Sequence, residues 1–235
     1  MELSRGQLGK LKISLPPVEE QRRIAEILDT IDETIQATER VIAKRSALQT
    51  GVVDSFMNSP GEDWSLCKLM DACVLQRGFD ITKAAQRPGP HPVVSSGGVS
   101  SFHDEWKVEG PGVVTGRKGL LGKVYFVDRD FWPHDTSLYV KDFRGNEPEF
   151  ISLLLRYLRL ERFDAASAVP TLNRNFIHPL PVRLPQVSGQ RRLIALTRAA
   201  ETQIETENIA LRKLLKLRNG LAVDLLSGRV RTVAS

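Results

Sequence analysis

The chain contains one segment twice, at a fixed offset of 169 residues. The first copy, residues 3–28, reads LSRGQLGKLKISLPPVEEQRRIAEIL, and the second, residues 172–197, reads LNRNFIHPLPVRLPQVSGQRRLIALT. Both copies hold a Leu-Pro pair and a Gln-Arg-Arg triplet at matching positions, and the register continues through a long helical pattern. The sequence therefore predicts two similar helices on either side of an unrelated block. Such a pair of helices can hold the domain between them at a set distance and orientation.

The first helix is predicted from about Val18 to Phe56, directly after a proline pair that ends a short strand predicted at residues 10–17. Its apolar residues recur at alternating steps of three and four, as on one face of an α-helix. They are Ile24, Leu28, Ile31, Ile35 and Ile42. A later set, Leu48, Val52 and Phe56, is shifted, which predicts that the apolar face drifts around the helix. At a rise of ~1.5 Å per residue the helix would be roughly 60 Å long, more than most globular cores need.

The second helix is predicted from about Val187 to Leu226, where Ser227 and Gly228 provide a stop. Its apolar face consists of Leu193, Ala200, Ile204, Leu211, Leu214, Leu217, Leu221 and Leu225. Two helices of equal length most simply pack on each other along these faces, antiparallel if the ends of the intervening domain lie close together. The residues that we expect in the interface are Ile24, Leu28, Ile35, Ile42, Leu193, Ile204, Leu211 and Leu217. The alternative is two independent helices that each recruit another chain.

The block between the helices has the pattern of a mixed α and β domain. Short apolar runs separated by Gly, Pro and Asp predict strands at residues 72–75, 92–95, 112–115, 123–127 and 137–140. The one convincing helix of the block is predicted at residues 148–163. The predicted fold class is therefore α+β, a mixed α/β domain flanked by two long helices that form an antiparallel coiled coil. The predicted domains are a first spacer region at 1–59, the mixed domain at 60–184 and a second spacer helix at 185–235.

The net charge of +5 arises almost entirely from the end of the chain. Residues 1–59 carry 8 basic and 9 acidic side chains and residues 60–170 carry 14 and 15, whereas residues 171–235 carry 11 and 4. A polyanion-binding face on the middle block would therefore have to be a local patch. The sequence has neither an apolar run of about 18 residues nor a signal-peptide core, so we expect a cytoplasmic protein with no membrane partner. Cys67 and Cys73 form neither a zinc pattern nor a disulfide framework, and we expect two inert thiols.

Motifs of the common catalytic classes are missing. The sequence has no G-x-x-x-x-G-K-[ST] loop, no H-E-x-x-H and no G-x-S-x-G. It also lacks the Asn/Asp-Pro-Pro-Tyr/Phe turn and the Phe-x-Gly-x-Gly loop of the usual adenine methyltransferases. The four histidines have no metal-like spacing. We therefore expect neither a metal site nor catalysis by this chain alone.

The stretch at residues 110–124, GPGVVTGRKGLLGKV, combines a strand with a glycine-framed basic turn. Glycines let the backbone approach a surface closely, while Arg117, Lys118 and Lys123 could reach phosphates or guanine edges. Four further polar stretches, at residues 76–80, 94–98, 132–137 and 169–175, add Arg77, Ser95, Ser96, His134 and Arg174. Taken alone, each stretch is more often an ordinary turn with solvated cations, and His134 could pair with Asp135 as easily as contact DNA.

Together these features resemble the DNA-specificity subunit of type I restriction–modification enzymes. In that family a target-recognition domain is followed by a long helical spacer, and the pair occurs twice. The matching motifs are the spacer start LPPVEEQRRIA at residues 15–25, its partial echo at 184–195, and the segments 77–78, 116–119, 135–138 and 170–173 of the middle block. The resemblance covers nearly the whole chain, and its spacer start is the most specific part.

The resemblance implies that the chain binds double-stranded DNA and supplies no chemistry or cofactor of its own. The DNA-facing residues would be Arg77, Ser95, Ser96, Arg117, Lys118, Lys123, His134 and Arg174. Methyltransferase subunits would dock along the coiled coil and methylate adenine at N6 with S-adenosylmethionine, and a motor–nuclease restriction subunit would join with ATP and Mg²⁺. The helix pair would act as a ruler, because half-sites at a fixed gap require recognition domains at a fixed distance.

The chain departs from the family pattern in having the order spacer–domain–spacer with one recognition domain. It begins at residues that match the last ones of an absent domain, so we expect a half-subunit, a truncated product or an excised fragment. The resemblance implies that a half-subunit can restore two-fold geometry as a homodimer. The main alternative is a coiled-coil scaffold whose central domain binds protein, which the near-neutral charge of residues 60–170 favours. A self-contained nuclease or methyltransferase is a further alternative, although its catalytic residues are not visible in the sequence.

Overall fold

The computed structural model describes residues 15–164 and 170–232, and these fall into two compact units. The helical unit comprises the described residues up to 48 and from 200 onward, and the globular unit comprises those within 49–199. Within these described residues, each helix is too short or too polar to cross a lipid bilayer.

Two long helices, α2 (Val18–Asn58) and α6 (Val187–Leu226), each contribute residues to both units. Their bounds confirm the two helices predicted from the repeat, to within two residues at each end. The predicted domain boundaries, 59/60 and 184/185, lie near the ends of the long helices, whereas the two compact units divide at 48/49 and 199/200, within the helices. The predicted domains stay a prediction. The strand predicted at residues 10–17 lies outside the described residues except for 15–17, which form no regular element.

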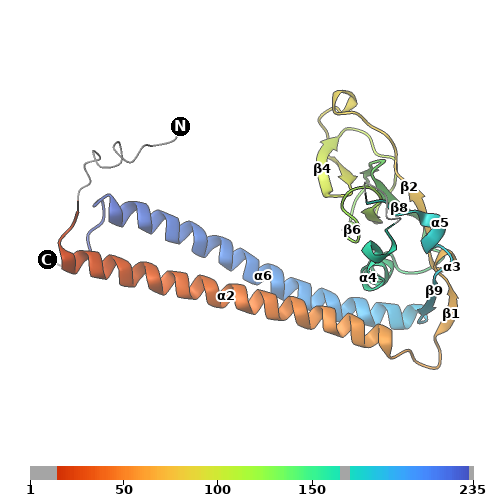
Figure 1. Cartoon of the computed structure of the whole chain (residues 1–235), viewed down its shortest axis with the longest axis horizontal. Coiled ribbons are helices and arrows are strands. Elements are labelled where there is room, and N and C mark those ends of the chain that lie inside the picture. The colour runs from red at the N-terminus through yellow and green to blue at the C-terminus, as the bar shows by residue number, and fades with distance from the viewer. Residues whose placement is uncertain (1–14, 165–169, 233–235) are drawn as a thin grey trace. The chain divides into compact units, whose positions relative to one another are not determined.

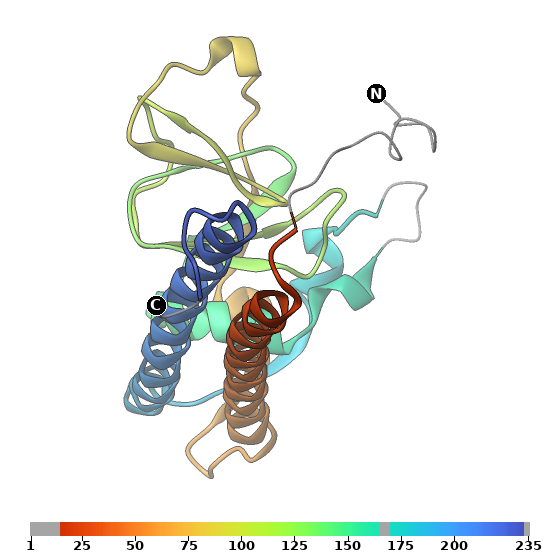
Figure 2. The same cartoon turned by 90° about the vertical axis from the view of Figure 1, so that its left-hand side faces the viewer.

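The two helices lie side by side and antiparallel in the helical unit (Figures 1 and 2). Asp32 of α2 accepts two hydrogen bonds from the guanidinium of Arg218 of α6, at 3.0 and 3.1 Å. Further along α2, Arg45 lies 3.8 Å from the carboxylate of Glu207. The residue number therefore rises on one helix as it falls on the other. These contacts confirm the predicted antiparallel pairing.

The interface between the helices follows the predicted spacing of three and four. Ile24 and Ile35 of α2 are only 5% and 7% exposed, and Leu225 of α6 is 4% exposed. The other predicted interface residues of the helical unit are half-buried: Leu28, Ile42, Ile204 and Leu211. Burial at alternating steps of three and four along both helices is the pattern of a coiled coil.

The prediction was wrong for one interface residue and for part of the later apolar set of α2. Leu217 is 52% exposed, because its neighbour Arg218 takes the inward position opposite Asp32. Of the later set predicted on α2, Leu48 and Val52 are 61% and 43% exposed, whereas Phe56 is partly buried and its neighbours Val53 and Met57 are buried in the main core. Leu193 is fully buried in the main core, which also contains Val53 and Met57 of α2.

The repeated Gln of the two sequence copies has the same role at the start of each helix. The side-chain amide of Gln21 donates to the carbonyl of Pro16 at 2.8 Å, and that of Gln190 donates to the carbonyl of Pro185 at 3.1 Å. Proline before the helix and a glutamine that folds back on it together mark where each helix begins. At the other end α6 stops as predicted, with Gly228 in the left-handed conformation (φ 72°).

The described strands of the globular unit form three small sheets. A four-stranded antiparallel sheet has the order β2-β8-β5-β6, a three-stranded sheet has the order β4-β3-β7, and β1 pairs with β9. The strand bounds are β1 Ser65–Lys68, β2 Val74–Arg77, β3 His91–Ser95, β4 Gly98–His103, β5 Gly112–Gly116, β6 Val124–Val127, β7 Trp132–Pro133, β8 Ser137–Asp142 and β9 Pro181–Leu184. The five predicted strands correspond to β2, β3, β5, β6 and β8.

The globular unit also contains short helices. They are α3 (Leu69–Ala72), α4 (Pro148–Tyr157), α5 (Arg174–Ile177) and the 3-10 turns η1 (Lys83–Ala85) and η2 (Leu160–Phe163). Helix α4 packs on β5 and β6 and buries Phe150, Ile151 and Leu155 completely. The predicted helix at 148–163 is broken after Tyr157, because Arg159 adopts a left-handed conformation (φ 50°).

Candidate nucleic-acid interface

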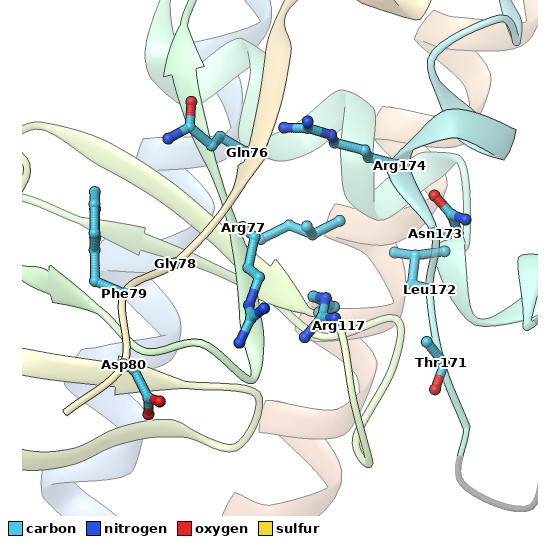
Figure 3. A pocket seen from close by; sticks show the side chains of 11 residues that line it. Gln76, Arg77, Gly78, Phe79, Asp80, Arg117, Thr171, Leu172, Asn173 and Arg174 are labelled. Carbon is cyan, nitrogen blue, oxygen red and sulfur yellow. The ribbon is translucent and has the colours of Figure 1, made fainter. Parts of the chain in front are cut away.

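A pocket of about 690 Å³ in the globular unit collects three of the arginines that the sequence analysis selected. Arg77 comes from the end of β2, Arg117 from the loop after β5, and Arg174 from the first residue of α5. Figure 3 shows these three segments converging on the pocket. The other lining residues are Gln76, Gly78, Phe79, Asp80, Leu138, Thr171, Leu172 and Asn173. We name this the arginine pocket.

Asp135 holds two of the arginines in place. Its carboxylate accepts a hydrogen bond from Nη2 of Arg77 at 2.9 Å, and its backbone carbonyl accepts one from Nη1 of Arg117 at 3.0 Å. A guanidinium carries five N–H donors, so a contact through one nitrogen leaves donors for a ligand. The third arginine, Arg174, donates to the carbonyl of Leu75 at 3.3 Å. The arginine pocket therefore presents positioned cations rather than freely rotating ones.

Gly78 is required for the approach of β2 to the segment that carries Asp135. The amide of Phe79 donates to the carbonyl of Pro133 at 2.8 Å, which draws the two backbones together. A Cβ atom at Gly78 would overlap the carbonyl oxygen of His134. Only glycine permits this approach, which places Arg77 beside Asp135.

The loop at residues 116–123, here the basic loop, is held by backbone hydrogen bonds on two sides. The amides of Arg117 and Lys118 donate to the carbonyl of Thr136 at 2.9 and 3.0 Å. On the other side, the amide of Gly119 donates to the carbonyl of Pro170 at 3.0 Å. The stretches 110–124, 132–137 and 169–175, which are separate in the sequence, therefore lie against one another.

The remaining residues of the predicted DNA-facing set have varied positions. Ser95 is the last residue of β3, and its hydroxyl donates to the carbonyl of Gly98 at 3.1 Å across the turn. The amide of Ser96 donates to the hydroxyl of Thr136 at 3.4 Å, which places this turn beside the basic loop. Lys118 and Lys123 are exposed on the basic loop, outside the lining of the arginine pocket. The assignment of all eight residues to DNA binding stays a prediction.

His134 lies beside two carboxylates. Its Nδ1 lies 3.0 Å from a carboxylate oxygen of Asp135 and 3.0 Å from the hydroxyl of Thr136. The ligand atoms of Asp80, His134 and Asp135 all lie within 4.8 Å of one another, so these three residues could approach a cation. The carboxylate of Asp135 is already paired with Arg77, however, and a cation would compete with that ion pair.

Sequence reasoning missed the non-basic residues of the arginine pocket, although it had selected their segments. Gln76 and Asn173 carry amides that can bind base edges, and Phe79 adds a flat apolar wall. His178 contacts the strand that carries Gln76 and Arg77: its Nε2 accepts a hydrogen bond from the amide of Leu75 in β2 at 3.1 Å. Burial and the nearby Arg174 both lower the pKa of His178, which favours the neutral ring that can accept this bond.

Comparisons by sequence match this chain to a described family and to a curated protein. The family described as "Type I restriction modification DNA specificity domain" matches residues 1–44. A Mycoplasma pneumoniae protein described as a type I specificity subunit is 22% identical over 208 residues, which cover 83% of this chain and 56% of that protein.

Solved structures of type I specificity subunits have the same fold. The S subunit from M. genitalium matches with a TM-score of 0.69 and 16% identity, over 88% of this chain and 61% of the other. The HsdS subunit from Thermoanaerobacter tengcongensis matches with a TM-score of 0.58 and 15% identity, over 93% and 61%. The chain therefore spans about three fifths of the length of these relatives. In its repeat, in the family match of its first 44 residues and in its fold, the chain resembles the DNA-specificity subunits of type I restriction–modification systems.

Proposed function

We propose that the globular unit binds a specific sequence of double-stranded DNA and that this chain positions catalytic subunits on it. The partners would be methyltransferase subunits, which methylate adenine at N6 with S-adenosylmethionine, and a motor–nuclease subunit that uses ATP and Mg²⁺. The chain itself would be non-catalytic. The observation that supports DNA binding most strongly is the convergence of Arg77, Arg117 and Arg174 on one pocket from three separate segments.

The chemistry of this pocket suits a DNA duplex. Arginine can bind the O6 and N7 atoms of guanine with two donors, and asparagine or glutamine can bind adenine in a similar way. Arg77 and Arg117 are held near one another through Asp135, so little conformational entropy would be lost when they bind. The exposed Lys118 and Lys123 would add phosphate contacts, which position a protein but do not read sequence.

The helical unit supports a role as a spacer and docking element. Its helices are joined by buried apolar residues and by ion pairs such as Asp32–Arg218, which fix their register. A second copy of the chain, bound through a two-fold axis, would supply a second recognition unit for an interrupted palindromic site. Light scattering that detects only monomers, with and without DNA, would count against this homodimer.

The experiment that tests the proposal is selection of bound duplexes from a random DNA library by the purified chain. We expect a single enriched consensus. The Arg117→Ala variant should lose discrimination by about 1–3 kcal/mol at one position if Arg117 contacts guanine with two donors. If it weakens binding to all sequences alike, Arg117 contacts a phosphate instead. The matched control is Arg183→Ala, which removes an exposed arginine of β9 outside the arginine pocket.

A chain that enriches no consensus and binds duplex DNA only weakly would contradict the proposal. The coiled-coil scaffold would then be the better explanation, and the partner of the globular unit would be a protein. Catalysis by the chain itself is tested separately, by incubation with DNA, Mg²⁺ and labelled S-adenosylmethionine. We expect neither cleavage nor label transfer.

A further inference from the structure

Leu120 lies at the exposed tip of the basic loop. Its side chain is 53% exposed, whereas the next residue, Leu121, is partly buried against the main core. Two consecutive leucines thus have opposite environments, one anchoring the loop and one facing outward. A single exposed leucine is common on protein surfaces, so its surroundings must decide whether it has a role.

The backbone around Leu120 is tightly constrained. A Cβ atom at Gly116 would overlap the carbonyl oxygen of Leu120, so the two ends of the turn are in direct contact. Gly119 and Gly122 adopt positive φ angles of 83° and 79°, which L-residues rarely adopt. With the hydrogen bond from Gly119 to Pro170, these contacts hold the backbone at Leu120 in one position. A side chain on a fixed backbone loses less conformational entropy on binding than one on a flexible loop.

The surroundings of Leu120 are the residues predicted to face DNA. Lys118 precedes it by two positions and Lys123 follows it by three, and both are exposed. One methyl carbon of Leu120, Cδ1, lies 3.7 Å from where a Cβ of Gly97 would be, in the turn that contains Ser96. An apolar side chain therefore stands between cations and a polar turn, at the place where the proposed function requires contact with DNA.

We propose that Leu120 contacts the 5-methyl group of a thymine in the major groove and so specifies T at one position of the target. This inference rests on the proposed function. An aliphatic side chain cannot hydrogen-bond to base edges, and among the groups on those edges in the major groove the thymine methyl is the apolar one. Leu120 would thus complement Arg117, which lies three residues earlier and can bind guanine or phosphate.

The test compares thymine with uracil, which lacks the 5-methyl group. Each thymine of the selected consensus duplex is replaced singly by uracil, and binding of the wild-type chain and of Leu120→Ala is measured by fluorescence anisotropy. At one position the wild type should lose about fourfold in affinity, because one methyl group is worth about 0.8 kcal/mol of burial. The Leu120→Ala variant should bind thymine and uracil duplexes equally there, and about fivefold more weakly than the wild type binds thymine.

Two controls separate recognition from folding. Leu66→Ala truncates a leucine of β1 that is 68% exposed and lies outside the pocket and the basic loop, and it should bind like the wild type. Leu120→Met keeps an apolar side chain of similar size and should retain the sensitivity to uracil. The inference is overturned if every uracil substitution affects the wild type and Leu120→Ala alike. If the wild type selects no consensus at all, the proposed function itself fails.

Discussion

Replacing Gly116 by alanine should disrupt the basic loop, because the added methyl group has no room. The new Cβ would overlap the carbonyl oxygen of Leu120 and lie 2.9 Å from its carbonyl carbon and 3.4 Å from the Cα of Leu121. These are backbone atoms, so no rotation of a side chain can relieve the overlap. The whole turn must move away from β5, where Gly116 pairs with Ser137 of β8.

The expected loss of stability follows from these contacts. Inserting a methyl group into a tightly packed site typically costs about 1–3 kcal/mol. Moving the turn also strains the hydrogen bond from Gly119 to Pro170, worth about 1 kcal/mol. Alanine restricts the unfolded chain, which offsets about 0.4–1 kcal/mol of this. We therefore expect a net loss of about 1–3 kcal/mol, and a melting temperature lower by about 2–4 °C for each kcal/mol.

The assay is thermal unfolding monitored by calorimetry, and DNA binding is measured at temperatures below the unfolding transition. The matched control is Gly51→Ala in α2, also in the globular unit, where a Cβ atom would have no neighbour within 4 Å. That substitution should stabilise the protein by roughly 0.5–1 kcal/mol, because alanine is the better helix former. A Gly116→Ala variant that melts at or above the wild-type temperature and binds DNA normally would refute the reasoning.

Three further predictions concern other parts of the chain. Burial and the charge of Arg174 hold the pKa of His178 below its ordinary 6.5, so the unfolded state takes up the proton first. The contribution of His178 to stability should therefore be full above about pH 6.5 and fall as the pH drops toward the lower folded pKa. The melting temperature of His178→Gln should fall less with pH than that of the wild type. Equal falls would count against a role of neutral His178 in stability. Burial raises the pKa of the Cys73 thiol to about 12, so iodoacetamide at pH 8 should leave it unlabelled until denaturant is added, as mass spectrometry would detect. Reversing the charge of Asp32 or of Arg218 alone should lower the melting temperature, and reversing both together should restore much of it; a double variant no better than the singles would argue against this pairing.

The periodic part of the fold could be predicted because its signals are local. Steps of three and four define both long helices, and the repeated Gln21 and Gln190 mark where each begins. The error at Leu217 has a non-local cause. Hydrophobicity alone favours leucine over Arg218 for the inward position, but Asp32 on the other helix supplies the counter-charge that lets the arginine occupy it.

The missed strands were also determined by distant partners. Ser65–Lys68 carries little apolar patterning, and it forms a strand because it pairs with Pro181–Leu184, far away in the sequence. The break at Arg159 had no local signal, since the residues around it favour a continued helix. In the arginine pocket, the arginines could be selected by type. The role of Asp135, which positions two of them, depends on the fold.

The salt dependence of DNA binding by the wild type and by single Ala variants of Arg77, Arg117 and Arg174 tests the central claim most directly. The logarithm of the association constant for the selected duplex should fall linearly with the logarithm of the salt concentration, by about 0.9 per phosphate contact. Each Ala variant should either reduce that slope or lose preference for the selected duplex over a scrambled one. Binding that is insensitive to salt and unchanged in all three variants would contradict the account.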